Sequence, residues 1–151
     1  APDGEGAGGR PPSDGNPLHV LVARVGKTES RSLKLENTDV RAVSTNNEMA
    51  VLHNRQGVGF FISRGRLARI PVDGGAARDL LEDVQEADWS PDGPKLAVGR
   101  WVNGQNQLEY PVGQVLYQSA GHLSHPRISP KGDRVALIWE TICEKKNQKS
   151  I

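Results

Sequence analysis

The chain has 151 residues, a mass of 16.4 kDa and a formal net charge of +1, with 19 Lys and Arg against 18 Asp and Glu. This length suits one domain, and the near-neutral balance offers no basic field for phosphate backbones, so we expect no nucleic-acid partner. Seventeen Gly, ten Pro and 36% hydrophobic residues fit short strands joined by turns better than a helical bundle. We therefore expect an all-β chain.

The single cysteine, Cys143, excludes an intramolecular disulfide and a cysteine-rich zinc site. No apolar run approaches the ~20 residues needed to span a bilayer, and the first residues do not have the pattern of a signal peptide. We expect a soluble protein with no membrane insertion. The compartment stays open between bacterial cytoplasm and periplasm, because an export signal removed earlier would leave the same sequence.

Three regions follow one another along the chain. Residues 1–17 are rich in Gly and Pro with almost nothing to bury, and are predicted to be flexible. Residues 18–140 alternate short apolar runs with turn sequences, which predicts strands. Residues 141–151 form a polar tail. Within the middle region only 77–87, ARDLLEDVQEA, would allow a helix, and a strand followed by a turn is favoured there. The predicted strands are 18–24, 40–44, 48–53, 58–62, 66–72, 95–101, 107–112, 114–118 and 134–140.

An internal repeat is the most informative feature of the sequence. SPDGPKLAV at 90–98 matches SPKGDRVAL at 129–137, a weaker copy, STNNEMAVL, begins at Ser44, and a bare APDG begins at Ala1. These starting points are 43, 46 and 39 residues apart, close to the period of roughly 40 to 50 residues of a four-stranded propeller blade. In each full copy Pro fixes φ early and Gly accepts positive φ late, so the pattern predicts a tight turn between two strands.

The segments LARIPVDGGAARDLLEDVQEADWSPDGPKLAVGRW and LEYPVGQVLYQSAGHLSHPRISPKGDRVAL resemble TolB-type, WD-related propeller repeats of bacterial proteins. They are particularly similar to the sensor-like propellers that follow the kinase domain of some bacterial serine/threonine kinases. The resemblance runs from about Pro17 to Trp139. It implies a partial β-propeller of about three four-stranded antiparallel blades that serves as a binding platform.

Closed propellers typically have four to eight blades, whereas a chain of this length provides about three. An open arc exposes apolar faces and unpaired strand edges. We therefore expect a homo-oligomer, most simply a dimer that completes a six-bladed ring.

The candidate ligand-binding residues precede the two clear turns. EADWSPDG aligns with SHPRISPKG, which places Asp88 and Trp89 in one copy and His125 and Arg127 in the next, with His122 nearby. We expect 122–127 to form a loop beside the central channel. For Trp89 core packing is favoured over ligand binding, with Asp88 capping a turn. Two imidazoles three residues apart could chelate a metal, but no third ligand is evident, so we expect no metal and no cofactor.

The leading functional hypothesis is a non-catalytic propeller module that binds a protein or a small ligand on its loop face. The alternative is a hydrolase or metal-dependent enzyme with its site in the channel. Its nearest motif, YQSAG around Ser119, lacks the first Gly of a nucleophile elbow. The basic cluster Arg64, Arg66 and Arg69 marks a solvated strand face or a site for an acidic partner. Core packing is the expected role of Phe60, Phe61, Trp101 and Tyr110.

Overall fold

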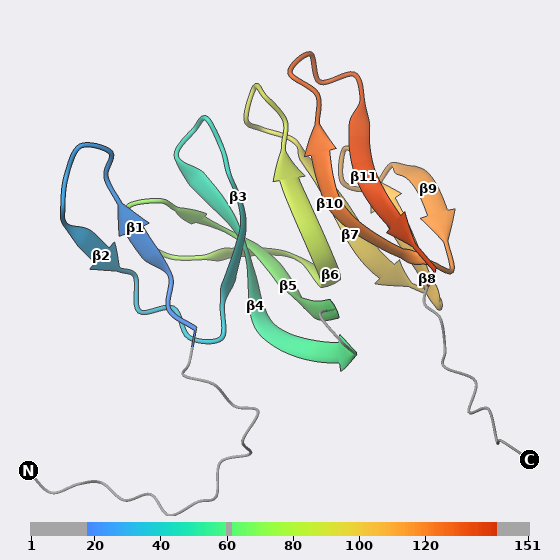
Figure 1. The fold of residues 1–151 in the computed structure, drawn as a ribbon, viewed down its shortest axis with the longest axis horizontal. Coiled ribbons are helices and arrows are strands. Elements are labelled where there is room, and N and C mark those ends of the chain that lie inside the picture. The colour runs from blue at the N-terminus through green and yellow to red at the C-terminus, as the bar shows by residue number, and fades with distance from the viewer. Residues whose placement is uncertain (1–17, 60–61, 142–151) are drawn as a thin grey trace, which may run out of the picture.

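The computed structural model describes residues 18–59 and 62–141 (Figure 1). Over these residues the chain is all-β, with antiparallel sheets and no helix, so the prediction of fold class is confirmed at that level. The predicted flexible segment 1–17, the APDG copy of the repeat, Phe60, Phe61, Cys143 and all but the first residue of the predicted tail lie outside the described residues. The strands are β1 (Leu21–Ala23), β2 (Ser30–Ser32), β3 (Asp39–Val43), β4 (Glu48–Gly59), β5 (Ile62–Pro71), β6 (Arg78–Trp89), β7 (Leu96–Val102), β8 (Gln105–Glu109), β9 (Val115–Ser119), β10 (His122–Ile128) and β11 (Val135–Glu140).

The strands form three sheets. Strands β3 to β9 pair in chain order in one seven-stranded sheet, while β1 pairs with β2 and β10 pairs with β11. The two small sheets lie at opposite ends of the molecule, with the seven-stranded sheet between them (Figure 1). Within the described ranges, no helix has the length and hydropathy to cross a membrane.

Strand β6 takes part in two different groups of strands. Its first half pairs with β5, where Leu67 lies opposite Leu81, and its second half pairs with β7, where Trp89 lies opposite Leu96. Between the halves Asp83 has a φ of 56°, a left-handed conformation that redirects the backbone. The large sheet therefore consists of two four-strand groups that share β6, and the strand favoured for 77–87 is confirmed.

The three copies of the repeat form the same hydrogen-bonded turn. In each copy the serine Oγ accepts a hydrogen bond at 3.1 Å from the backbone N of a residue at the start of the second strand or directly before it. The serine backbone N donates to the carbonyl of that same residue at 2.7 to 2.8 Å. The predicted turn is thus confirmed in every copy within the described residues. The serine and its partner are Ser44 and Glu48, Ser90 and Lys95, and Ser129 and Arg134.

The fourth position of each turn has positive φ: 56° at Asn47, 90° at Gly93 and 72° at Gly132. Glycine adopts this conformation without strain, and asparagine is among the residues that tolerate it best. This explains how STNN takes the place of a Ser-Pro-x-Gly turn. The first copy is also one residue shorter than the other two, counted from the serine to the residue with which its backbone N bonds.

The core consists of two apolar layers on opposite faces of β4 and β5. Side chains alternate along these strands, so Met49 and Val51 enter one layer, while Ala50 and Leu52 enter the other. The second layer therefore lies between the two four-strand groups of the large sheet, which pack face to face across it. The first layer brings Val20, just before β1, against β4 and β5. The first layer comprises Val20, Met49, Val51, Ala68 and Ile70, and the second Ala50, Leu52, Leu67, Val84, Ala87, Trp89, Leu96 and Val98.

Two strands were not expected from the sequence, and one of them corrects a prediction. Residues 122–127, predicted as a loop, belong to strand β10, which pairs with β11 from His122 opposite Glu140 to Ile128 opposite Val135. The register shifts between Ser124 and Arg127, and His125 there has a φ of 52°. Such a bulge accommodates Pro126, which lacks a backbone N–H. Strand β2, of sequence SRS, contains no apolar residue that would reveal it.

Candidate functional site

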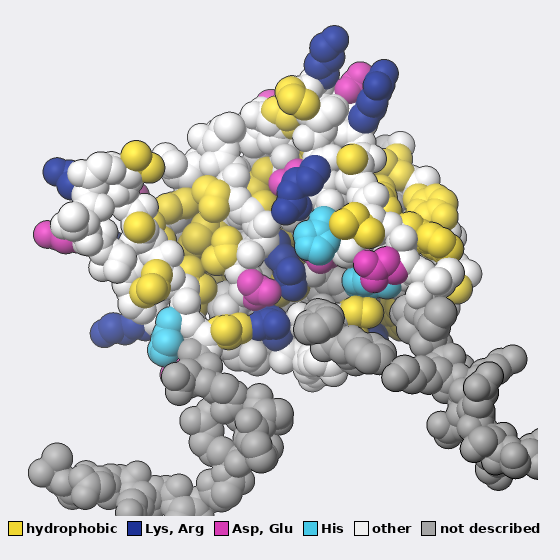
Figure 2. Space-filling view, in the orientation of Figure 1, with side chains coloured by type: hydrophobic (Ala, Val, Ile, Leu, Met, Phe, Trp, Pro, Cys, Tyr) yellow, Lys and Arg dark blue, Asp and Glu magenta, His cyan; other side chains and the backbone are white. Residues whose placement is uncertain are grey.

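The strands that lead into the three serine turns are neighbours in space. Strand β3 contacts β6, and β6 contacts β10. Charged and histidine side chains gather in the middle of the surface drawn in Figure 2, with apolar side chains on either side. We use the term charged face for a set of titratable residues on β3, β6, β10 and β11. They are linked by ion pairs, by strand pairing or by their effect on the pKa of His122. The charged face comprises Asp39, Arg41, Glu86, His122, His125 and Glu140.

Arg41 links β3 to β6. Its Nη2 lies 3.1 Å from Asp39 Oδ2, and its Nη1 lies 3.6 Å from Glu86 Oε2. The side chains of Arg41 and Glu86 are only 20% and 13% exposed, so water screens their attraction less than at the open surface. Arg55 Nε lies 3.7 Å from the same Asp39 oxygen. Arg41 Nε is buried and has no hydrogen-bond partner among the described residues.

His122 lies half-buried on β10, directly across from Glu140 on β11. Burial lowers the pKa of His122, and this effect outweighs the raising influence of the Glu140 and Glu86 charges, while His125 lowers the pKa further. The imidazole is therefore neutral at neutral pH. Its Nδ1 is buried without a hydrogen-bond partner in the part of the chain that the structure describes.

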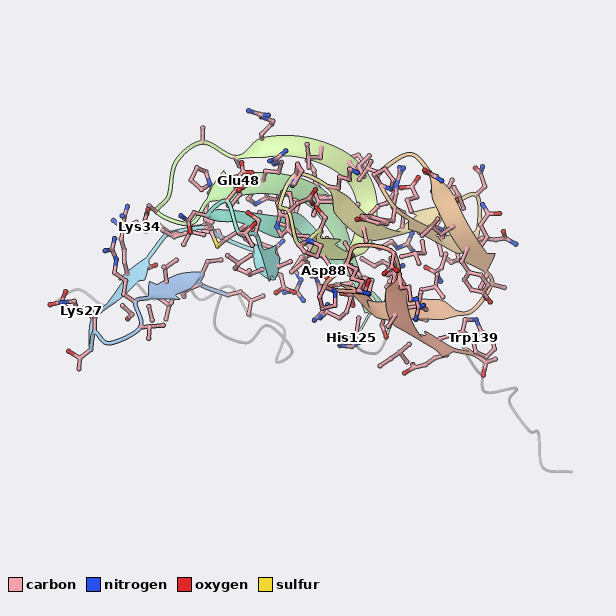
Figure 3. All side chains as sticks on the ribbon, turned by 90° about the horizontal axis from the view of Figure 1, so that it is seen from above. Lys27, Lys34, Glu48, Asp88, His125 and Trp139 are labelled. Carbon is pink, nitrogen blue, oxygen red and sulfur yellow. The ribbon has the colours of Figure 1, made fainter. Side chains whose placement is uncertain are left out.

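His125 and Arg127 are exposed at the bulge of β10. Figure 3 shows His125 at the rim of the molecule, on the side of β10 and β11. Arg127 Nη1 donates to the carbonyl of Pro126 at 2.7 Å. Residues 18–59 and 62–141 contain no group of three or more His, Cys, Asp or Glu side chains arranged to hold a metal ion.

Asp88 and Trp89 have structural contacts. We expected Asp88 to cap a turn; its Oδ2 accepts a hydrogen bond at 2.9 Å from the backbone N of Ile128 on β10, 40 residues later. Trp89 is 5% exposed in the second apolar layer, which agrees with core packing. The Arg69 guanidinium lies 5.0 Å from its ring centroid, within the range of a cation–π contact.

Ser119 serves as a hydrogen-bond acceptor. Its Oγ accepts from Trp139 Nε1 at 2.7 Å and from the backbone N of Gly121 at 3.0 Å. A serine nucleophile needs an adjacent general base to take its proton, and the bonds found here join the end of β9 to β11. The structure therefore shows no organised nucleophile at this serine.

The basic cluster on β5 is occupied by contacts within the chain. Arg66 binds Glu82 at 2.6 Å and Asp79 at 3.2 Å, and the hydrogen bond with Glu82 is the main cause of its raised pKa. Arg69 pairs with Glu48, and the Arg64 guanidinium lies 5.1 Å from the Trp101 ring centroid. These arginines are thus less available to an acidic partner than their sequence spacing suggests.

Comparisons of the chain with protein-family models, with curated proteins and with solved structures found no match. Function is therefore inferred from the residues and geometry of the charged face.

Four residues of the charged face were missed by the sequence reasoning. Asp39 and Arg41 precede the weakest copy of the repeat, Glu86 lies beside the more conspicuous Asp88 and Trp89, and Glu140 ends the last described strand. The signal that was available is the presence of charged residues in each strand leading into a serine turn. Which of them face one another depends on the packing of β3, β6 and β10.

Proposed function

We propose that the chain is an arc of TolB-like, WD-related β-propeller repeats that acts as a non-catalytic platform for binding a protein or a small ligand. Each four-strand group is a blade in this proposal. Support comes from the three serine turns with common hydrogen bonds, from the two groups that share β6, and from the face-to-face packing of their sheets. Strand β3, the second half of β6, and β10 are then the inner strands of successive blades.

The observation that carries the binding function is a pair of unsatisfied polar atoms on the charged face. Arg41 Nε and His122 Nδ1 are both buried without a partner among the described residues. Leaving a buried polar group unpaired costs about 1–3 kcal/mol. A shift of either side chain toward the surface would let hydrogen-bonding oxygens of a ligand recover part of that cost, which favours a partner with carboxylate, amide or hydroxyl groups.

The geometry favours binding over catalysis. The carboxylates of Asp39 and Glu86 are paired with Arg41, and the Ser119 hydroxyl anchors Trp139. A pocket of about 460 Å³ does form, but it lies between the β1–β2 hairpin and the loop after β5 rather than on the charged face. A surface of paired charges suits recognition of a partner's surface or of an extended segment.

The proposal is tested by measuring binding to an immobilised panel of acidic, basic and neutral peptides by biolayer interferometry. We expect a peptide that binds the wild-type chain to bind at least about tenfold more weakly to His125→Ala, on the charged face, and to Arg127→Ala, beside it at the same bulge of β10; tenfold corresponds to about 1.4 kcal/mol. Both residues are exposed, so the fold should be retained. His19→Ala is the matched control, because His19 is an exposed histidine outside the charged face. Binding that is indifferent to all three changes would contradict the proposal.

A further inference from the structure

The two small sheets are complementary halves of a four-strand group. The Ser129 turn joins β10 to β11, just as the Ser44 turn joins β3 to β4 and the Ser90 turn joins β6 to β7. Strands β10 and β11 are therefore a first and a second strand, and residues 18–59 and 62–141 supply no third strand beside them. Strands β1 and β2 precede β3, which is a first strand, so they correspond to a third and a fourth strand, with no second strand beside them in the same ranges. The edge that β11 leaves open is the edge at which a strand in the position of β1 would pair.

Both open edges carry exposed apolar side chains. Val20, just before β1, is 5% exposed and packs in the first apolar layer, whereas Leu21 is 61% exposed. At the other end Ile138 and Trp139 on β11 are each 49% exposed, and Tyr117 on the neighbouring β9 is 48% exposed. Apolar side chains are gathered at this end of the surface in Figure 2. Unpaired strands with apolar side chains are ready-made sites for strand addition.

One copy of the chain cannot join these edges. The seven-stranded sheet separates β1–β2 from β10–β11 (Figure 1), and Figure 3 shows Lys27, in the β1–β2 turn, far from Trp139 on β11. β1 of the same copy therefore cannot supply a strand at the β11 edge. A second copy offers a strand of the correct position, together with an equivalent open edge in return.

We propose that two copies of this chain close head to tail, with β1 of each copy pairing antiparallel with the open edge of β11 of the other. The complete groups show this pairing between second and third strands, in β4 with β5 and in β7 with β8. Leu21 of one copy then packs beside either Ile138 or Trp139 of the other, because these two side chains lie on opposite faces of β11. Each copy contributes two complete groups and two halves, so two copies form about six groups, within the usual range of four to eight for a closed ring. This assembly is independent of any ligand on the charged face.

The test is the mass of the full chain in solution, measured by light scattering after size exclusion at tens of micromolar. We expect two chains for the wild type and one chain for Leu21→Asp and for Ile138→Asp, because each places a carboxylate in both junctions of the ring. Leu80→Asp is the matched control: Leu80 is 37% exposed on the first half of β6, outside both junctions, and its variant should keep the mass of two chains. Circular dichroism confirms that each variant remains folded.

An equimolar mixture of Leu21→Asp and Ile138→Asp gives the sharper result. A mixed pair contains one junction with both changes and one junction with neither, so mixing should restore the mass of two chains. A symmetric contact made by one edge with itself would not be restored in this way. A monomeric wild type, in which another segment of the same chain covers β11, would overturn the proposal, as would assemblies larger than two chains or a Leu21→Asp variant that remains a dimer.

Discussion

The carboxylate of Asp88 accepts a hydrogen bond at 2.9 Å from the backbone N of Ile128, across 40 residues of sequence. The bond joins the second half of β6 to β10, the strands that carry Glu86 on one side and His122 and His125 on the other. It therefore fixes the spacing of the charged face, although Asp88 itself is not free to bind a ligand through that oxygen.

Replacing this carboxylate should loosen β10. We expect Asp88→Ala to lower the free energy of unfolding by about 1–3 kcal/mol, because the Ile128 N–H loses its acceptor in a partly buried position. Asp88→Asn keeps an acceptor oxygen and should retain most of the stability. Urea denaturation measures both, and hydrogen exchange at Ile128 reports the local effect. Equal losses in the two variants would show that the charge of Asp88, and not this bond, is what matters.

The close approach of two turns makes Gly93 a test of the contact between them. Its φ is 90°, and an added Cβ would lie 2.6 Å from Asn46 Nδ2 and 2.8 Å from Thr45 Oγ1 of the preceding turn. Gly104 has a similar φ of 78° with nothing within 4 Å. We expect Gly104→Ala to cost about 1–2 kcal/mol for the left-handed conformation alone, and Gly93→Ala to cost somewhat more, because the exposed Asn46 and Thr45 side chains must also shift. Thermal unfolding of both variants measures the difference in stability between them. Equal losses would show that the contact between the two turns adds nothing to the cost of Gly93→Ala.

The lowered pKa of His122 makes stability depend on pH. Because the imidazole takes up a proton more readily in the unfolded chain, the unfolded state binds more protons as pH falls below about 6.5, the ordinary histidine value. Stability should therefore be fully present above that pH and decrease as pH falls toward the lower folded-state pKa. His122→Gln should flatten this dependence in urea titrations between pH 5 and 8, and His122→Ala should flatten it in the same way. An NMR titration that placed the His122 pKa above 6.5 would contradict the prediction.

Because the Ser119 hydroxyl accepts the hydrogen bond of Trp139, we expect its removal to lower stability without changing hydrolytic activity. Ser119→Ala removes the acceptor of Trp139 Nε1, and we expect a loss of about 1 kcal/mol, since Trp139 is partly exposed and water can replace the bond. Ser30→Ala on exposed β2 is the control. On a panel of ester, peptide and phosphoester substrates, wild type, Ser119→Ala and the double variant His122→Ala/His125→Ala should show the same background. Hydrolysis lost on either change would favour the enzyme alternative.

Local patterns were sufficient for much of the fold. The apolar runs predicted most of the strands, and the serine turns were found where the repeat placed them, because turn residues act through their own φ and hydrogen bonds. The sequence was less informative at β10. There Ser124, His125 and Pro126 hide a strand, since its pairing with β11 tolerates them only through a bulge.

What the sequence determined by itself is the all-β chain, its repeated serine turns and the alternation that buries β4 and β5 on both faces, because these depend on neighbouring residues. Only the tertiary structure decided that Arg41 reaches Glu86, that Asp88 holds Ile128, and that the Arg66 charge is matched within the chain. These contacts join residues that are 16 to 45 positions apart in the sequence, and their geometry depends on register and sheet packing. A repeat in one sequence predicts that similar units exist, but the face on which their charged residues meet is set by how the units stack.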